Sequence, residues 1–366
     1  MFAARVLGAL ALTCMVASPI TASAAPPAQD LINDLSYVAA RLRADHPGFV
    51  EGLDPSVPAV AGSALREALK EARLARTDAD YNRIMGGYAA AFRDPHVSVH
   101  LEGEVGSQEA ARGPAGALVR LGPSAWMLVL PTFYAGHDAF DSTMAAIARA
   151  RDELAGEQPA LLAIDLRGNG GGSSSPADQV LTALWGPAAP AVLSARRPKA
   201  SLWRTSEGVI ADLGERRERI ARRYPESLAD FDRLLRGIEA ASRRGQPLHR
   251  SPLPMAGGGA TLKAGPKEVV VVTDGACISA CLDFLDRLLE APDVVHVGEP
   301  TGSDTLYTEV QSVELPSGRG AITIPMQRLE GRRRPAHVPY GPSLRLSGEE
   351  NIAAWLADKV AALPRR

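Results

Sequence analysis

The chain has 366 residues, a formal net charge of −2 and 46% hydrophobic residues, which is enough apolar material to bury a large core in one or two domains. The near-neutral charge and the 5% aromatic content argue against a nucleic-acid-binding surface, and no run of like charges indicates binding to a membrane surface. The binding partner must therefore be inferred from a site rather than from the overall charge.

Residues 1–24 differ in composition from the rest of the chain. They read MFAARVLGALALTCMVASPITASA, with an apolar run at residues 6–17 and small residues at Ala22 and Ala24. This layout predicts a secretory signal peptide cleaved after Ala24, and the apolar run is too short for a permanent transmembrane helix. A lipoprotein signal acylated at Cys14 is the weaker alternative. We therefore expect a mature protein exported to a bacterial periplasm or beyond, without a permanent membrane span.

Residues 25–95 have the pattern of a small helical domain. Apolar residues recur there at helical spacing, at Leu31, Leu35, Val38, Ala39 and Leu42. Two further helical patterns follow, SALREALKEARLAR and DADYNRIMGGYAAAF, the second with Asp78 as a candidate cap. The helical period ends at RDPHVSVH, where the alternation of a strand begins.

Residues 96–366 predict an α/β core, because short apolar strands alternate with helical patterns. The segments that carry this alternation are AWMLVLPTF, FDSTMAAIARARDEL, ALLAIDLRG, SPADQVLTALWG, EVVVVT, ISACLDFLDRLLEA and VVHVGEP. Strands of this kind indicate a mainly parallel sheet covered by helices on both faces. A charged segment at residues 196–265, helical and Arg-rich between 206 and 242, interrupts the core. It is either a substrate-binding element or a decorative helical pair.

A glycine-rich turn follows one of these strands. The segment LLAIDLRGNGGGSSSPADQV passes from a buried strand through residues 168–172 to a helix that Pro176 opens. Consecutive glycines let backbone N–H groups approach a ligand, and a helix N-terminus favours negative charge. The turn lacks the spacing and the lysine of a phosphate-binding loop, so we expect it to bind an oxyanion. The expected donors are the N–H groups of Gly170 and Gly171.

A second strand, VVVVT, leads into a turn and a helix that carries Ser279. A serine in this place is either a helix cap or a nucleophile raised at the sheet edge, with the Ala280 N–H available to the same oxyanion. Cys277 and Cys281 flank the serine. In an oxidising compartment they can form a disulfide, because residues four apart on a helix have Cα atoms about 6 Å apart. The alternative is two small buried residues, and two thiols without a nearby histidine argue against a metal.

Four segments together resemble the C-terminal processing (tail-specific) serine peptidases and their tricorn-core relatives. These segments are AFRDPHVSVH, AIDLRGNGGG, CISACLDFL and VVHVGEPTGSDTLYTEVQSVELPSG. The resemblance covers most of the mature chain and implies a Clp/crotonase-like core. Counting back without gaps from Thr301 places the family's nucleophile on Ser279.

The departures from the family pattern bear on the mechanism. Where the tail-specific branch has its catalytic lysine, three residues after Thr301, this chain has Asp304, and no lysine occurs between Lys267 and Lys359. The tricorn-like branch uses serine, histidine and an acid, and the matching histidine is His96. For the acid that orients the imidazole, Glu330 is the first candidate by approximate position and Asp304 is the second.

These observations predict an exported serine peptidase that cleaves peptides or proteins through a Ser-His-acid mechanism and an acyl-enzyme. About 30 residues separate His96 from the strand at Trp126, which leaves no room for a peptide-binding PDZ domain. No metal or organic cofactor is expected. Two alternatives remain open, a non-catalytic peptide-binding or scaffold protein on the same fold and a hydrolase of non-peptide esters.

Overall fold

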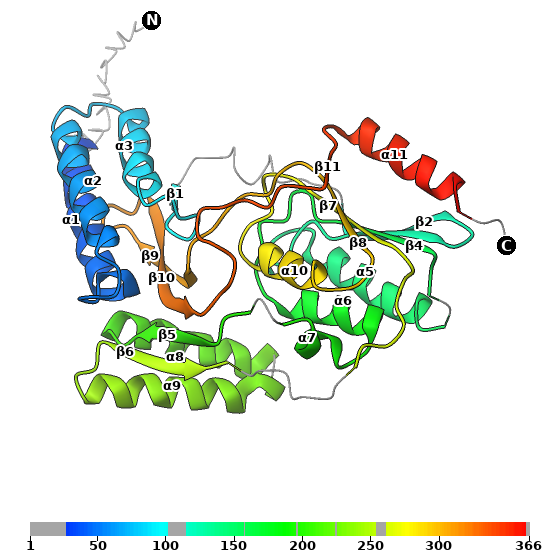
Figure 1. Ribbon diagram of the computed structural model, residues 1–366. Coiled ribbons are helices and arrows are strands. Elements are labelled where there is room, and N and C mark those ends of the chain that lie inside the picture. Colours follow the sequence, from blue (N-terminus) through cyan, green and yellow to red (C-terminus); the bar gives the residue numbers. More distant parts are fainter. Residues whose placement is uncertain are drawn as a thin grey trace, which may run out of the picture.

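A computed structural model describes residues 27–101, 115–156, 158–194, 197–223, 225–253 and 261–363. Two β-sheets organise these residues, and each is covered by its own set of helices (Figure 1). The signal peptide predicted for residues 1–24 and the lipoprotein alternative at Cys14 lie outside the described residues. Export therefore stays a prediction.

The first sheet has six strands and is parallel except at one edge. In spatial order its strands are β11 (Leu344–Arg345), β8 (Val294–Gly298), β7 (Val269–Thr273), β4 (Leu161–Asp165), β3 (Ala125–Val129) and β2 (Ala117–Gly122). All neighbours pair in parallel apart from β2 and β3, which are antiparallel. The mainly parallel sheet predicted from the alternating pattern is thus confirmed.

Helices on both faces explain why the central strands are continuous apolar runs. Side chains alternate along a strand, so Val269 and Val271 join one core while Val270 and Val272 join another. Most of the helices that cover this sheet pack in the first core. They are α5 (Phe140–Glu153), α6 (Ser175–Trp185), α7 (Ala189–Val192) and α10 (Ala280–Leu288). The second core is closed by α11 (Glu349–Ala361) through Ile352 and Leu356.

The second sheet is antiparallel, and its presence was not predicted from the sequence. Its strands are β1 (Val99–Leu101), β10 (Gly320–Glu330), β5 (Ala200–Arg204) and β6 (Leu248–Pro252), with β9 (Tyr307–Glu314) paired to the other side of β10. The long strand β10 meets β1 near its start and β5 near its end. It therefore joins the N-terminal part of the chain to the inserted segment.

Three helices at the N-terminal end confirm the helical pattern that was read there. They are α1 (Pro27–Asp45), α2 (Ser56–Ala72) and α3 (Asp78–Ala90). The cap of α3 is Thr77, which forms a capping box with Asp80, and not the predicted Asp78, which is the first residue of the helix. Their apolar faces share one core with Val313 and Ile322 of β9 and β10. The helices thus pack against strands from the far end of the sequence, and the division at residues 95 and 96 stays a prediction.

The inserted segment at residues 196–265 contains strands as well as the expected helices. Along the chain, helices α8 (Glu207–Arg223) and α9 (Leu228–Arg243) follow β5 and precede β6. The two strands pair with each other in the antiparallel sheet (Figure 1). Trp203 and Met326 of that sheet pack against Val209 and Ile238 of the two helices. The insertion is therefore built into the second sheet by both of its ends.

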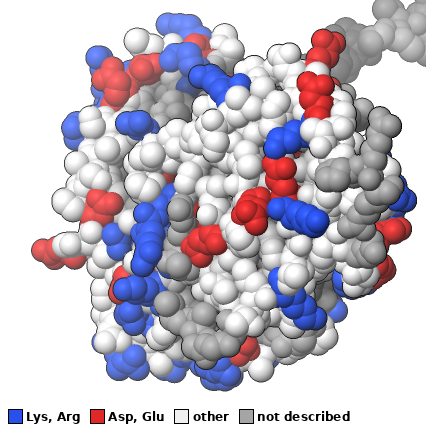
Figure 2. Space-filling model, turned by 45° about the vertical axis from the view of Figure 1, so that its right-hand side comes forward, with Lys and Arg blue, Asp and Glu red and all other residues white. Residues whose placement is uncertain are grey.

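The surface carries no uniform charge on the face shown in Figure 2, where basic and acidic side chains are interspersed with uncharged ones. Within the described ranges, no helix is long and apolar enough to span a bilayer.

Candidate active site

Ser279 lies at the start of α10, just after the turn that follows β7, as the strand-turn-helix pattern predicts. Its backbone has a φ of 55° and a ψ of −124°, a region that residues other than glycine rarely occupy. Its side chain makes no cap hydrogen bond to the helix. The hydroxyl is therefore left available for another partner, which is the requirement for a nucleophile rather than for a helix cap.

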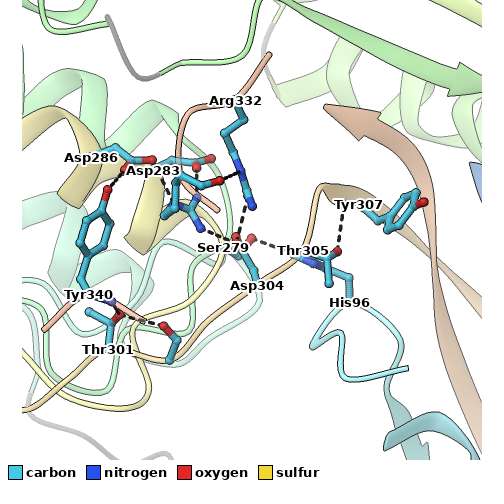
Figure 3. Close-up of polar contacts among 12 residues, drawn as sticks. His96, Ser279, Asp283, Asp286, Thr301, Asp304, Thr305, Tyr307, Arg332 and Tyr340 are labelled. Atoms are coloured by element: carbon cyan, nitrogen blue, oxygen red, sulfur yellow. Dashed lines mark hydrogen bonds and ion pairs between the residues drawn. The ribbon is translucent and has the colours of Figure 1, made fainter. Parts of the chain in front are cut away.

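His96 supplies that partner from the turn between α3 and β1. The distance between His96 Nε2 and Ser279 Oγ is 3.1 Å, although the two residues are 183 positions apart in sequence. Strand β10 holds the segment that contains His96, because Thr323 Oγ1 donates to the His96 carbonyl oxygen and the Thr323 N–H donates to the Ser98 carbonyl oxygen. Figure 3 shows Ser279 and His96 facing each other.

Asp94 orients the imidazole from the same turn. Its Oδ1 lies 3.0 Å from His96 Nδ1 and also accepts the His96 backbone N–H at 2.9 Å. The other oxygen, Oδ2, accepts a 2.6 Å hydrogen bond from Thr305 Oγ1. Only 3% of the Asp94 side chain is exposed, so its charge depends on these bonds.

The pKa of Asp94 is lowered and the pKa of His96 is raised, as expected for two groups that form an ion pair. Burial alone raises the pKa of Asp94, but the hydrogen bonds and charge of His96 and the bond from Thr305 outweigh it, and the pKa is lowered. Burial alone lowers the pKa of His96, but the hydrogen bond and charge of Asp94 outweigh it, and the pKa is raised. The charges of Asp304 and Asp283 act on His96 in the same direction.

Glu330, the first candidate for the orienting acid, lies elsewhere. It ends β10 with 41% of its side chain exposed, and both of its oxygens accept 3.0 Å hydrogen bonds from Arg250 of β6. His96 Nδ1 already has Asp94 as its partner. The assignment of Glu330 is therefore wrong for this structure, because an approximate position in the chain does not reveal that the inserted strand β6 engages the carboxylate.

Asp304, the second candidate, stands near His96 without a hydrogen bond to it. Its Oδ1 accepts from Arg332 Nη1 at 3.0 Å and from Arg334 Nη1, and all three side chains are almost fully buried. Arg334 also pairs with Asp283 and with Asp286, whose other oxygen accepts from Tyr340. In Figure 3 the Asp283, Asp286 and Tyr340 members of this ionic cluster lie on the side of Ser279 away from Tyr307. Asp304 thus acts on His96 through its charge alone.

The glycine turn approaches Ser279 closely. A Cβ added at Gly171, whose φ is +89°, would lie 2.9 Å from both Ser279 Cβ and the Ala280 nitrogen. Among the three expected oxyanion donors, the Gly171 N–H donates to Asn169 Oδ1 at 2.9 Å. The N–H groups of Gly170 and Ala280 have no acceptor among the described residues. Gly171 therefore contributes close approach, and the other two contribute free donors.

The two flanking cysteines form a disulfide. Cys277 and Cys281 are bonded to each other with their Cα atoms 5.3 Å apart, and neither side chain is exposed. The bond encloses Ser279 in its ring. In the described ranges, no three His, Cys, Asp or Glu side chains are placed to hold a metal ion.

Sequence reasoning missed Asp94 and Thr305. Asp94 was visible as the first residue of the Asp-x-His segment, two positions before His96. An aspartate at this spacing can accept both the backbone and the ring N–H of the same histidine, and this local signal was available from the sequence. No sequence signal links Thr305 to Asp94, because 211 positions separate them.

A serine hydroxyl, an imidazole and a buried carboxylate connected in this order define a serine hydrolase. Residues 127–332, more than half of the chain, match the profile of peptidase family S41. The chain belongs to this family and is a serine-type peptidase, so its substrates are peptides or proteins. Comparison with curated protein sequences finds no match.

Solved structures show the same fold. Mature CPAF is similar with a TM-score of 0.59 and 12% identity, covering 91% of this chain and 96% of that one. Mature CPAF complexed with lactacystin is similar with a TM-score of 0.59 and 11% identity, covering 91% of this chain and 98% of that one. The predicted Clp/crotonase-like α/β core is confirmed.

Proposed function

We propose that this protein is an exported peptidase in which Ser279 is the nucleophile, His96 the general base and Asp94 the orienting acid. The observation that carries the proposal is the 3.1 Å contact between Ser279 Oγ and His96 Nε2, with Asp94 on the other ring nitrogen. A base with a raised pKa, held in one tautomer by a buried carboxylate, suits proton transfer from a serine.

The reaction divides into two acyl-transfer steps. Ser279 Oγ attacks the carbonyl carbon of the scissile peptide while its proton passes to His96 Nε2. The carbonyl oxygen becomes an oxyanion, which the N–H groups of Ala280 and Gly170 stabilise. When the C–N bond breaks, His96 returns the proton to the departing amine and leaves an acyl-enzyme. Water then gives a proton to His96 Nε2 and attacks the ester carbonyl. As the ester C–O bond breaks, His96 returns this proton to Ser279 Oγ, which releases the acid and free Ser279.

The residue that replaces the family lysine supports the same assignment. Asp304 is not placed to act as the base for Ser279, because its Oδ1 already accepts hydrogen bonds from two arginines and the partner of the Ser279 hydroxyl is His96. Its charge instead favours the protonated form of His96, the form that exists once the serine has lost its proton.

Covalent labelling tests the proposal without knowledge of the natural substrate. Intact mass measured after exposure to a fluorophosphonate should show one adduct on the protein, absent in Ser279→Ala and in His96→Ala. Ser312→Ala on β9 and His100→Ala on β1 are matched controls that should keep the adduct, since both residues are exposed in the antiparallel sheet. An unlabelled but folded protein, or an adduct that survives Ser279→Ala, would contradict the assignment.

Export is tested separately. When the full chain is expressed in a bacterium with a periplasm, the periplasmic fraction should contain a protein whose mass corresponds to loss of residues 1–24. A full-length protein retained in the cytoplasm would contradict this part of the proposal.

A further inference from the structure

The segment that carries Ser279 is held in an unfavourable conformation. A φ of 55° with a ψ of −124° costs free energy for a residue with a side chain, and such strain persists only where surrounding contacts enforce it. The question is which contacts enforce it here.

Ordinary hydrogen bonds tie this segment mainly to itself. Among the described residues, the backbone N–H and C=O groups of residues 277–279 take part only in bonds inside residues 274–283, such as Cys277 to Asp274 and Asp283 to Ser279. Asp274 adds a link to the glycine turn by accepting the Gly168 N–H. That link lies five residues before Ser279, so it does not fix the φ of the serine itself.

The disulfide adds a covalent constraint at the serine. It joins Cys277, at the end of the turn, to Cys281, in the first turn of α10, and closes a ring with Ser279 at its centre. Both cysteines are fully buried in the core between the parallel sheet and its helices. The ring is thereby anchored in this core, while Ser279 Oγ lies 3.1 Å from His96 Nε2.

The position of the bond argues against two other roles. Stabilisation by a disulfide grows with the length of the loop that it closes, and here only three residues lie inside the loop, so its effect on global stability is small. A redox switch needs a sulfur that a reductant can reach, and neither sulfur-bearing side chain is exposed.

We propose that Cys277 and Cys281 are positioning residues, whose disulfide holds the backbone of Ser279 in the strained conformation that points its hydroxyl at His96. This inference rests on the proposed function, in which Ser279 is the nucleophile. Without the bond, the serine relaxes towards an ordinary φ and its hydroxyl leaves the 3.1 Å contact. The disulfide therefore acts on the reactivity of Ser279 more than on the stability of the fold.

The test compares the rate of fluorophosphonate labelling across pH in four proteins. They are the wild type, Cys277→Ala with Cys281→Ala, the volume-restoring Cys277→Val with Cys281→Ala, and the core control Ile147→Val. Because misplacement by about 1 Å can cost about 10²-fold in rate, the plateau rate of both double variants should fall roughly 10- to 100-fold. The pH at which the labelling rate reaches half of its plateau should not change, because Asp94 still orients His96. Amide hydrogen exchange should accelerate in residues 274–283 and remain as in the control elsewhere.

The outcomes separate this inference from the proposed function. Double variants that label at the wild-type rate would overturn the positioning role while leaving Ser279 as the nucleophile. A loss of rate accompanied by faster exchange throughout the protein would also overturn it, since that is the result of a purely structural bond. A disulfide-bonded wild type that does not label at all would overturn the proposed function, and the positioning role with it.

Discussion

The two halves of the candidate site are built in different ways. The nucleophile half, formed by β7, the turn after it and α10, is contiguous in sequence and is closed on itself by a disulfide. The base half starts from a three-residue segment, Asp94 to His96, but it is completed by Thr305 and Thr323 from the far end of the chain. One half is thus a local structure against which the glycine turn packs, and the other depends on the assembled antiparallel sheet.

This difference determines where each half is vulnerable. The nucleophile half depends on backbone conformation and close approach, so changes that add atoms near Ser279 should damage it. The base half depends on a chain of buried polar contacts, so the loss of one hydrogen bond should weaken it in steps.

Gly171→Ala should damage the nucleophile half most. The new Cβ would lie 2.8 Å from the Ile278 carbonyl oxygen and 2.9 Å from Ser279 Cβ, in a backbone with a φ of +89°. We expect the labelling rate to fall by on the order of 10²-fold or more, because the serine and the turn must move apart. Gly275→Ala is the control, since an added Cβ there meets nothing within 4 Å. Equal rates for the two variants would refute the role of close approach.

Thr305→Val should weaken the base half by a smaller step. It removes the 2.6 Å hydrogen bond to Asp94 Oδ2 and leaves a buried carboxylate oxygen without that donor. A hydrogen bond to a charged group is worth about 1.5–3 kcal/mol, so we expect roughly a tenfold or larger fall in labelling rate. Thr305→Ser keeps the hydroxyl and should restore most of the rate. A Thr305→Val variant that labels at the wild-type rate would contradict the role of this hydrogen bond.

The pH dependence of labelling should report the electrostatic surroundings of His96. The base must be neutral to accept a proton, so the rate rises as pH passes through its pKa, and the raised pKa places this rise above the ordinary value of about 6.5.

Asp283→Asn sharpens the same measurement with the smallest expected effect. It removes a negative charge that raises the pKa of His96, and should therefore shift the rise to lower pH while Arg334 keeps its other two partners. The exposed Asp230→Asn on α9 is the control and should leave the profile unchanged. A shift to higher pH, or no shift, would contradict the electrostatic assignment.

The same contrast explains what the sequence could and could not predict. Ser279, the glycine turn and the parallel strands are encoded by short patterns, because a buried parallel strand and the turn after it each have a local signature. The antiparallel sheet was missed because its strands come from four separate parts of the chain. Glu330 is a candidate for the orienting acid only by its approximate position along the chain. Its neighbour in space, Arg250, belongs to an insertion whose strands the sequence does not predict.

The central claim is that Asp94, and not Glu330, orients the catalytic histidine, and one comparison tests it most directly. The rate of fluorophosphonate labelling should be measured for Asp94→Asn and Glu330→Gln beside the wild type. Asparagine removes the charge and the tautomer preference at His96 Nδ1, so the rate should fall by on the order of 10³- to 10⁴-fold. Glu330→Gln breaks only the surface pair with Arg250 and should label at the wild-type rate. The opposite pattern, with Asp94→Asn reactive and Glu330→Gln inert, would contradict the account.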